Sequence, residues 1–280
     1  LIDKLKSEVA TGQDEIGAKL IKDAKTTLSP ILTRIINIGY ETSTFPDCMK
    51  TAIIKALHKK DDPDDITNYR PISILPTLSK LLERAPTDQI VEYMEINNLL
   101  TRNQHAYRKG HSTQTCLVEV VNHLYKLIDK KKYTAIASLD LSKAFDSISH
   151  SLIIQKLSNL NMSESTLEWV KSYLSNRKQR TKFSSYMSSE AAVTSGVPQG
   201  SIIGPLLFLC FTNDLSNEFE GKCKMVAYAD DTQLIVDGDS LSQLLTKIEE
   251  MLTIAQKLYA ANSMKNNIGK TEVLIINTRK

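Results

Sequence analysis

Two acidic sites lie beside apolar segments that predict β-strands. Asp140 comes at the end of the apolar run 133–141, and Asp230 and Asp231 lie in the turn 228–231 between two further apolar segments. A carboxylate beside a buried strand is costly when unpaired, and adjacent carboxylates repel each other unless a counter-charge lies close. Three carboxylates on neighbouring strands would bridge two Mg²⁺ ions about 3.5 to 4 Å apart, which favours in-line phosphoryl displacement. Aspartate is also common in hairpin turns, so Asp230 and Asp231 taken alone equally fit a plain turn.

The segment 195–205, between the acidic sites, is rich in residues that set unusual backbone conformations. It contains three glycines and two prolines. Such a backbone, free of side chains, suits a surface that passes close to a flat ligand such as a base pair. A loop that leads into a helix has the same composition, so both interpretations stay open. The four aspartates at 61–65 lack the glycine and distal glutamate of a calcium loop and indicate a solvated turn.

Hydrophobic periodicity predicts the elements that must position these residues. Residues 1–24 are polar and predict a helix with a weakly defined start. Further helices are expected at 26–40, 77–98, 112–131, 149–160, 163–174, 202–217 and 241–259, and strands at 51–57, 133–141, 222–228, 232–236 and 272–276, with a polar turn at 184–189 between two strand-like segments. Pro86 falls inside the second of these helices, where an interior proline costs about 3 kcal/mol or more. The irregular alternation and the tight hairpin favour an α+β fold over a doubly wound parallel sheet.

Composition sets wider limits on the class of protein. The chain has 280 residues, of which 41% are apolar and 24% charged, and this predicts a packed core rather than disorder, collagen or a coiled coil. The apolar stretch 202–211 is too short to span a bilayer, and the opening residues lack the apolar region of a signal peptide. The four cysteines form no C-x-x-C pair, which favours free thiols in a reducing compartment. A net charge of +3 does not by itself indicate a nucleic-acid-binding protein.

Several motifs in a fixed order carry a family resemblance. They are LDLSKAFD at 139–146, GVPQGS at 196–201 and YADD at 228–231, with NYRPIS at 68–73 and QHAYRKGHST at 104–113 upstream, and NSMKNN at 262–267 and KTE at 270–272 downstream. In this order the chain resembles the reverse transcriptases of non-LTR (LINE-like) retrotransposons, from about residue 46 to residue 277. The missing start methionine suggests a piece of a longer protein.

The resemblance implies the fingers and palm of a right-hand polymerase, with an antiparallel palm sheet backed by helices and with the thumb absent. The fingers are expected at 46–111 and 147–200, the palm at 112–146 and 201–280, and a helical extension at 1–45. The missing endonuclease and thumb regions would belong to the longer polyprotein. An intracellular protein with a nuclear site of action is also implied.

The reaction that the resemblance implies is RNA-templated addition of deoxynucleotides to a DNA primer 3′-hydroxyl, with no membrane partner. Asp140, Asp230 and Asp231 are the expected catalytic acids, and with the Leu141 carbonyl they would hold two Mg²⁺ ions, for which Mn²⁺ is a possible substitute. The expected nucleotide-binding residues are Lys60, Arg70, Phe145, Gln199, Gly200 and Lys270. The expected nucleic-acid contacts are Arg108, Arg177, Lys178, Arg180, Lys182 and Tyr228, with 130–132 as a further basic run.

Alternatives remain at three levels. Phe145 fits either a gate below the sugar that excludes a 2′-hydroxyl or a core phenylalanine, and the basic residues fit either nucleic-acid contacts or a solvated surface. The same scaffold also serves group II intron maturases. A truncated remnant that binds nucleic acid without polymerising would retain the same motifs.

Overall fold

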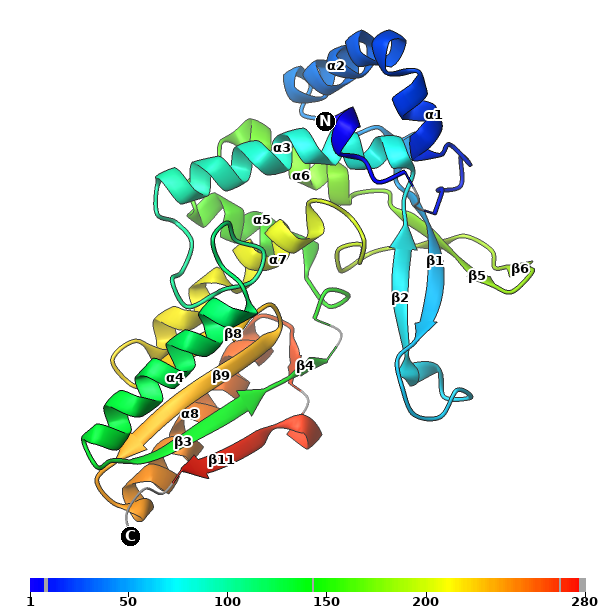
Figure 1. The fold of residues 1–280 in the computed structure, drawn as a ribbon. Helices are drawn as coiled ribbons and strands as arrows, with labels where there is room; N and C mark the ends of the chain where they lie inside the picture. Colours follow the sequence, from blue (N-terminus) through cyan, green and yellow to red (C-terminus); the bar gives the residue numbers. More distant parts are fainter. Residues whose placement is uncertain (8–9, 143, 267, 277–280) are drawn as a thin grey trace. The chain divides into compact units, whose positions relative to one another are not determined.

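The computed structural model describes residues 1–7, 10–142, 144–266 and 268–276. The chain forms two compact units, and each unit is assembled from two separate parts of the sequence (Figure 1). Unit 1 comprises Leu1–Asn97 and Ser149–Phe208, and unit 2 comprises Asn98–Ile148 and Leu209–Lys280. Both units combine helices with a sheet, so the predicted mixture of α and β structure is confirmed.

The sheet of unit 1 is built on a hairpin. Strands β1 (Thr51–His58) and β2 (Tyr69–Ile74) pair antiparallel, and β5 (Lys178–Phe183) joins β1 in parallel. Two short strands, β6 (Tyr186–Met187) and β7 (Ala191–Ala192), pair antiparallel with β5. Ala52 and Ile54 alternate on β1 and pack with Leu75 in a buried cluster. One face of this sheet therefore points to the core, and the other is left for polar side chains.

Helices make up most of the rest of unit 1. They are α1 (Ala18–Asp23), α2 (Lys25–Glu41), α3 (Thr77–Ile96), α5 (His150–Asn159) and α6 (Glu164–Leu174), with 3₁₀ turns at Ile2–Lys4, Asp47–Met49 and Ile66–Asn68. Helices α5 and α6 begin after Ser149 and Ser163, whose hydroxyls accept hydrogen bonds from the first-turn backbone, as good N-caps do. Helix α3 continues through the buried Pro86, so the interior proline does not end it.

The sheet of unit 2 is antiparallel and four-stranded, in the order β11 (Glu272–Ile276), β3 (Tyr133–Leu139), β9 (Asp231–Gly238) and β8 (Lys224–Tyr228). Helix α4 (Thr113–Asp129) packs Val120 and Leu127 against Val226 and Ile235 on one face. Helix α8 (Leu241–Ala261) lies along the other face of the sheet (Figure 1). The short strands β4 (Leu141–Ser142) and β10 (Lys265–Asn266) pair with each other, and 3₁₀ turns occupy Asn213–Phe219 and Ile268–Lys270.

Several predicted elements differ from those observed. The helix expected at 202–217 is α7 (Gly204–Thr212) followed by a 3₁₀ segment, and the change comes at Asn213, whose side chain binds the backbone of Leu99 and Thr101. Strands β2, β4 and β10 were not predicted, and a short strand, β6, lies within the polar turn expected at 184–189. Within the described residues, no helix has both the length and the apolar character needed to cross a bilayer.

Candidate active site

The strand register of unit 2 brings the acidic residues to one end of its sheet. Leu139 of β3 pairs with Thr232 of β9 in an antiparallel register. Asp140 follows Leu139 and Asp231 precedes Thr232, so these two acids lie opposite each other. Tyr228 pairs with Asp231 across β8 and β9, which leaves Ala229 and Asp230 as the two residues of the connecting turn. We call residues 228–231 the acidic turn. Two strands that are neighbours in the sheet thus carry the predicted catalytic acids at the same end.

The donor atoms at this end suit a hard divalent cation. Carboxylate and backbone carbonyl oxygens are the ligands that Mg²⁺ and Mn²⁺ prefer, and Leu141, the expected carbonyl ligand, opens β4 directly after Asp140. The ammonium of Lys270 lies 3.4 Å from Asp140 Oδ2, so a cation already balances this carboxylate. Among the described residues, no three His, Cys, Asp or Glu side chains form a group that could hold a metal ion. The convergent three-acid metal site therefore stays a prediction.

Two aromatic residues lie near the acidic turn. Tyr107 has a left-handed backbone (φ 58°) and packs edge-on to Phe145, with ring centroids 6.4 Å apart. Burial and then the negative charge of Asp230 raise the pKa of the Tyr107 hydroxyl. Phe145 is only half-buried, so it is not a fully enclosed core side chain, and the gate hypothesis stays open.

In unit 1 the predicted nucleotide-pocket residues lie on a tightly held loop. We call residues 196–204 the glycine loop. The Ser73 N–H of strand β2 donates to the Gln199 carbonyl at 2.8 Å. Gly200 has φ 124°, and a Cβ there would come within 2.6 Å of the Ser73 carbonyl oxygen. Gly200 is therefore required by the close passage of β2, a reason that sequence reasoning, which considered a flat ligand or a loop leading into a helix, did not find.

Glu83 holds the glycine loop from helix α3, and sequence reasoning missed it. Its side chain is fully buried, and its Oε2 accepts hydrogen bonds from the Ile202 and Ile203 N–H groups at 2.7 and 3.3 Å. The Ser79 hydroxyl donates to its Oε1 at 2.8 Å. Burial raises the pKa of the Glu83 carboxyl, although these hydrogen bonds act in the opposite direction. An acid on the buried stripe of α3, four residues after Ser79 and seven before Ile90, was the available signal.

Arg177 was predicted to contact nucleic acid, and the structure corrects this. Only 2% of the residue is exposed. Its Nη1 donates to the Tyr173 carbonyl at 2.9 Å, and its guanidinium lies 4.5 Å above the Tyr173 ring centroid. Arg177 follows Tyr173 by four residues at the end of α6, so it caps the helix and stacks on its ring instead of facing solvent.

Four of the other predicted cations of unit 1 share one face of its sheet with Lys55. Lys55 of β1 lies opposite Lys182 of β5, and Leu57, two residues further along β1, lies opposite Arg70 of β2. Because side chains alternate along strands, these cations lie on one side, away from the buried face of β1. We call Lys55, Arg70, Lys178, Arg180 and Lys182 the basic face. Lys178 is paired with Glu190 at 3.0 Å, and Lys55 was not predicted from the sequence.

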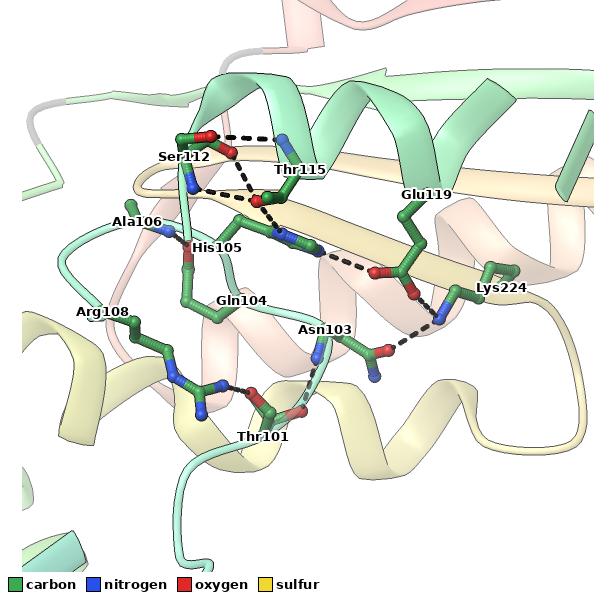
Figure 2. A network of polar contacts seen from close by, with 10 residues as sticks. All are labelled: Thr101, Asn103, Gln104, His105, Ala106, Arg108, Ser112, Thr115, Glu119 and Lys224. Atoms are coloured by element: carbon green, nitrogen blue, oxygen red, sulfur yellow. Dashed lines mark hydrogen bonds and ion pairs between the residues drawn. The ribbon is translucent and has the colours of Figure 1, made fainter. Parts of the chain in front are cut away.

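Two predicted residues lie apart from these groups. Lys60 stands in the exposed loop after β1, with its ammonium 3.9 Å from the Asp61 carboxylate. Arg108 of unit 2 donates from Nη1 to the Thr101 carbonyl at 2.7 Å and so helps to fix its own segment (Figure 2). Tyr228, by contrast, belongs to one of these groups: it is half-buried and is both the last residue of β8 and the first residue of the acidic turn.

Comparisons with known proteins give the chain a family. The family model of the reverse transcriptase (RNA-dependent DNA polymerase) matches residues 57–278. The chain is 31% identical over 96% of its length to the RNA-directed DNA polymerase from mobile element jockey of Drosophila funebris, of which it covers 30%. It is 33% identical over 79% of its length to the probable RNA-directed DNA polymerase from transposon X-element of Drosophila melanogaster, of which it covers 25%. The putative 115 kDa protein in type-1 retrotransposable element R1DM of the same species is 28% identical over 98% of the chain, which covers 26% of it.

The chain thus spans 25 to 30% of the length of these relatives, and the family model covers most of the chain. Two of these relatives are named as RNA-directed DNA polymerases, and the third belongs to a retrotransposable element, so the predicted resemblance to non-LTR retrotransposon enzymes is confirmed. This chain belongs to the reverse transcriptase (RNA-dependent DNA polymerase) family.

Proposed function

We propose that this chain carries the nucleotide-addition centre of an RNA-directed DNA polymerase from a non-LTR retrotransposon. The observation that supports this most is the register of β3 and β9, which sets Asp140 opposite Asp231 in a chain of the reverse transcriptase family. The substrates are deoxynucleoside triphosphates, an RNA template and a DNA primer, as the names of the relatives suggest.

In this proposal unit 2 provides the palm and unit 1 the fingers. The antiparallel sheet with α4 and α8 on its two faces supports the palm assignment, and the basic face supports a phosphate-binding role for unit 1. The compact units differ from the predicted boundaries. Residues 98–111 and 147–148 lie in unit 2, and residues 201–208 and the predicted extension 1–45 lie in unit 1.

Asp140, Asp230 and Asp231, with the Leu141 carbonyl, would hold two Mg²⁺ ions, for which Mn²⁺ can substitute. When bound, such ions lower the pKa of the primer 3′-hydroxyl and neutralise charge on the departing pyrophosphate. The ammonium of Lys270, beside Asp140, holds a proton that it can give to a pyrophosphate oxygen as the bond to the α-phosphorus breaks.

The remaining residues bind and orient the substrates. Arg70 presents a guanidinium fork that matches phosphate oxygens, and Lys60 adds a point charge for the triphosphate. Gln199 and Gly200 line the nucleotide, and Phe145 blocks a ribose 2′-hydroxyl. Tyr228 and the cations Arg108, Lys178, Arg180 and Lys182 contact the template and primer.

Primer extension on poly(rA)/oligo(dT) with Mg²⁺ and dTTP tests the proposal. We expect the chain to extend the primer and the Asp140→Asn variant to bind the duplex without extending it. Binding without extension by the unsubstituted chain would favour an inactive remnant. Extension confined to a structured intron RNA would favour a group II maturase.

A further inference from the structure

The Gln104 side chain hydrogen-bonds to the backbone of Ala229 in the acidic turn. Its Nε2 donates to the Ala229 carbonyl at 3.1 Å, and its Oε1 accepts from the Ala229 N–H at 2.9 Å. The same Oε1 accepts from the Ala106 N–H at 2.9 Å (Figure 2). Only 6% of Gln104 is exposed. One buried amide therefore pairs with both backbone groups of the residue that directly precedes Asp230.

Ala229 needs such support because its backbone is unfavourable. Its φ is 55°, in the left-handed region that an L-residue with a Cβ adopts at a cost. Glycine is the usual residue at a tight hairpin position with positive φ. Two hydrogen bonds from one rigid neighbour offset this cost and restrict the turn to one conformation.

Gln104 is itself held in place by its neighbours in the chain. The Asn103 carbonyl accepts from the Ala227 N–H at 2.7 Å, and the His105 N–H donates to the Ala227 carbonyl at 2.9 Å. Residues 103–105 therefore run along the edge of β8 as a short parallel bridge. Gln104, between the two bonded residues, points its side chain toward the turn at the end of that strand.

A buried histidine ties this segment to helix α4. His105 Nδ1 lies 3.0 Å from Thr115 Oγ1 and Nε2 lies 2.8 Å from Glu119 Oε2, while Glu119 also pairs with Lys224 of β8 (Figure 2). Burial acts to raise the pKa of Glu119, but Lys224 and His105 lower it below its ordinary value. The Lys224 ammonium in turn donates to Asn103 Oδ1 at 3.2 Å. The segment is thus fastened to both the strand and the helix beside it.

We infer that Gln104 is a positioning residue for the acidic turn, which fixes the Asp230 and Asp231 carboxylates in the arrangement that binds a divalent cation. The inference rests on the proposed function. A glutamine suits this role because it is neutral and carries both a donor and an acceptor. A carboxylate there would lack the donor and would add negative charge beside two acids.

Three forms of the chain test this inference. Gln104→Met keeps the length of the side chain but removes its hydrogen bonds. Asn213→Leu is the matched control, since Asn213 grips the backbone of Leu99 and Thr101 with the same kind of amide pair, at 2.7 and 2.8 Å, and does not touch the turn. The wild-type chain is the reference. The readouts are Mn²⁺ affinity by EPR titration, exchange of the Ala229 amide by NMR, and primer extension as a function of Mg²⁺.

We expect Gln104→Met to lower Mn²⁺ affinity by about 10- to 100-fold, the usual effect of removing a residue that orients metal ligands. Its Ala229 amide should exchange faster, and its extension rate should recover at high Mg²⁺. Asn213→Leu should lower the melting temperature comparably and keep the Mn²⁺ affinity of the wild type. Unchanged Mn²⁺ affinity in Gln104→Met, or equal losses in both variants, would overturn the inference.

The failure of the proposed function has a different signature. If the wild-type chain binds no Mn²⁺ that Asp230→Asn removes, the proposed catalytic centre is wrong and the role of Gln104 toward a cation falls with it. If the wild type binds Mn²⁺ at these acids and Gln104→Met binds it equally well, only the inference about Gln104 fails.

Discussion

The acidic turn of unit 2 and the glycine loop of unit 1 are each held by hydrogen bonds from one buried side chain to their backbone. The side chain is a neutral amide at the turn and a carboxylic acid at the loop. Each is an irregular segment with a left-handed residue, Ala229 in one and Gly200 in the other. Each is gripped by one buried side chain from another part of its unit. Gln104 binds the backbone of the turn, and Glu83 binds the N–H groups of Ile202 and Ile203 in the loop, just before α7.

The difference between the two side chains follows from what each one holds. The glycine loop presents only N–H donors to Glu83, and a carboxylate, which has acceptors and no donor, can accept both of them at Oε2. The acidic turn presents a donor, an acceptor and two nearby negative charges, so a neutral amide is the better match. The charge and the hydrogen-bonding groups of a loop therefore explain which type of buried polar residue holds it.

The largest expected effect is a loss of activity without a change of fold, on substitution of Asp140. If the acids carry the reaction, Asp140→Asn should lower the primer-extension rate by about 10²- to 10³-fold, in the range seen when one electrostatic catalytic group is removed. Circular dichroism should show an unchanged fold. Asp237→Asn, further along β9 and away from the acidic turn, is the control and should retain activity. Equal activities of the two variants would show that Asp140 takes no part in the reaction.

A substitution in the glycine loop should instead lower the free energy of unfolding. Gly200→Ala places a Cβ 2.6 Å from the Ser73 carbonyl oxygen, whereas Gly110→Ala, also at positive φ, meets no atom within 4 Å. Both variants carry backbone strain, but only the first adds a clash, which costs about 1 to 3 kcal/mol. Urea unfolding should show Gly200→Ala as the less stable by this amount. Similar values for both would mean that β2 moves aside at no cost.

The two gripping residues should also differ in their pH dependence. Burial raises the pKa of Glu83 above its ordinary value of 4.5, so the folded chain binds this proton more tightly than the unfolded chain. The stability gained is fully present below pH 4.5 and is lost as the pH rises through the raised pKa, by at most about 1.4 kcal/mol per pH unit.

Glu83→Gln should remove this contribution. Unfolding free energies measured from pH 4 upward should fall with pH more steeply in the wild type than in Glu83→Gln. Parallel curves would show that Glu83 keeps the same pKa in the folded and unfolded chain.

Phe145 provides a test of selectivity at the acidic end. Phe145→Ala should raise the incorporation of rGTP relative to dGTP by roughly tenfold, because a removed aromatic ring leaves room for the 2′-hydroxyl. Competition assays with both nucleotides measure the ratio. Tyr125→Ala, an exposed aromatic residue on α4, is the control. A ratio that stays the same would favour a packing role for Phe145.

The smallest expected effect concerns the basic face. Lys182→Ala should weaken template–primer binding a few-fold and reduce the slope of log affinity against log salt by about 1, since one phosphate contact is lost. Lys19→Ala, an exposed lysine of α1, should leave the slope unchanged. Fluorescence anisotropy at several salt concentrations distinguishes the two. Identical slopes in both variants would contradict a phosphate role for this face.

The sequence predicted the elements with regular patterns. The apolar run before Asp140 and the strands around the acidic turn have the expected periodicity, and β3, β8 and β9 lie there. It failed at strand β2, which contains Pro71 and polar residues and is completed by pairing with its hairpin partner β1. It also could not show contacts between distant segments, such as β5, which joins β1 from over a hundred residues away.

The buried polar residues were the hardest part of the candidate site to predict. Arg177 resembles its surface neighbours in the sequence, and only its spacing from Tyr173 indicates a helix cap. Gln104 lies in a recognised motif, but its partner Ala229 is known only once the chain has folded. Residue type, spacing and the family resemblance lead to the three acids, whose catalytic role stays a prediction, while the residues that contact the acidic turn became visible only in the structure.

The interleaving of the two units has a consequence for how the chain is made. Residues 98–148 of unit 2 are synthesised before residues 149–208 of unit 1, and β11 comes last. Strand β3, which leads into Asp140, lies between β9 and β11 in the finished sheet, so it waits for both of its neighbours during synthesis. Such long-range pairing slows folding and leaves strand edges open to aggregation. Nascent chains that stop before Glu272 should therefore depend on chaperones and show no nucleotide addition.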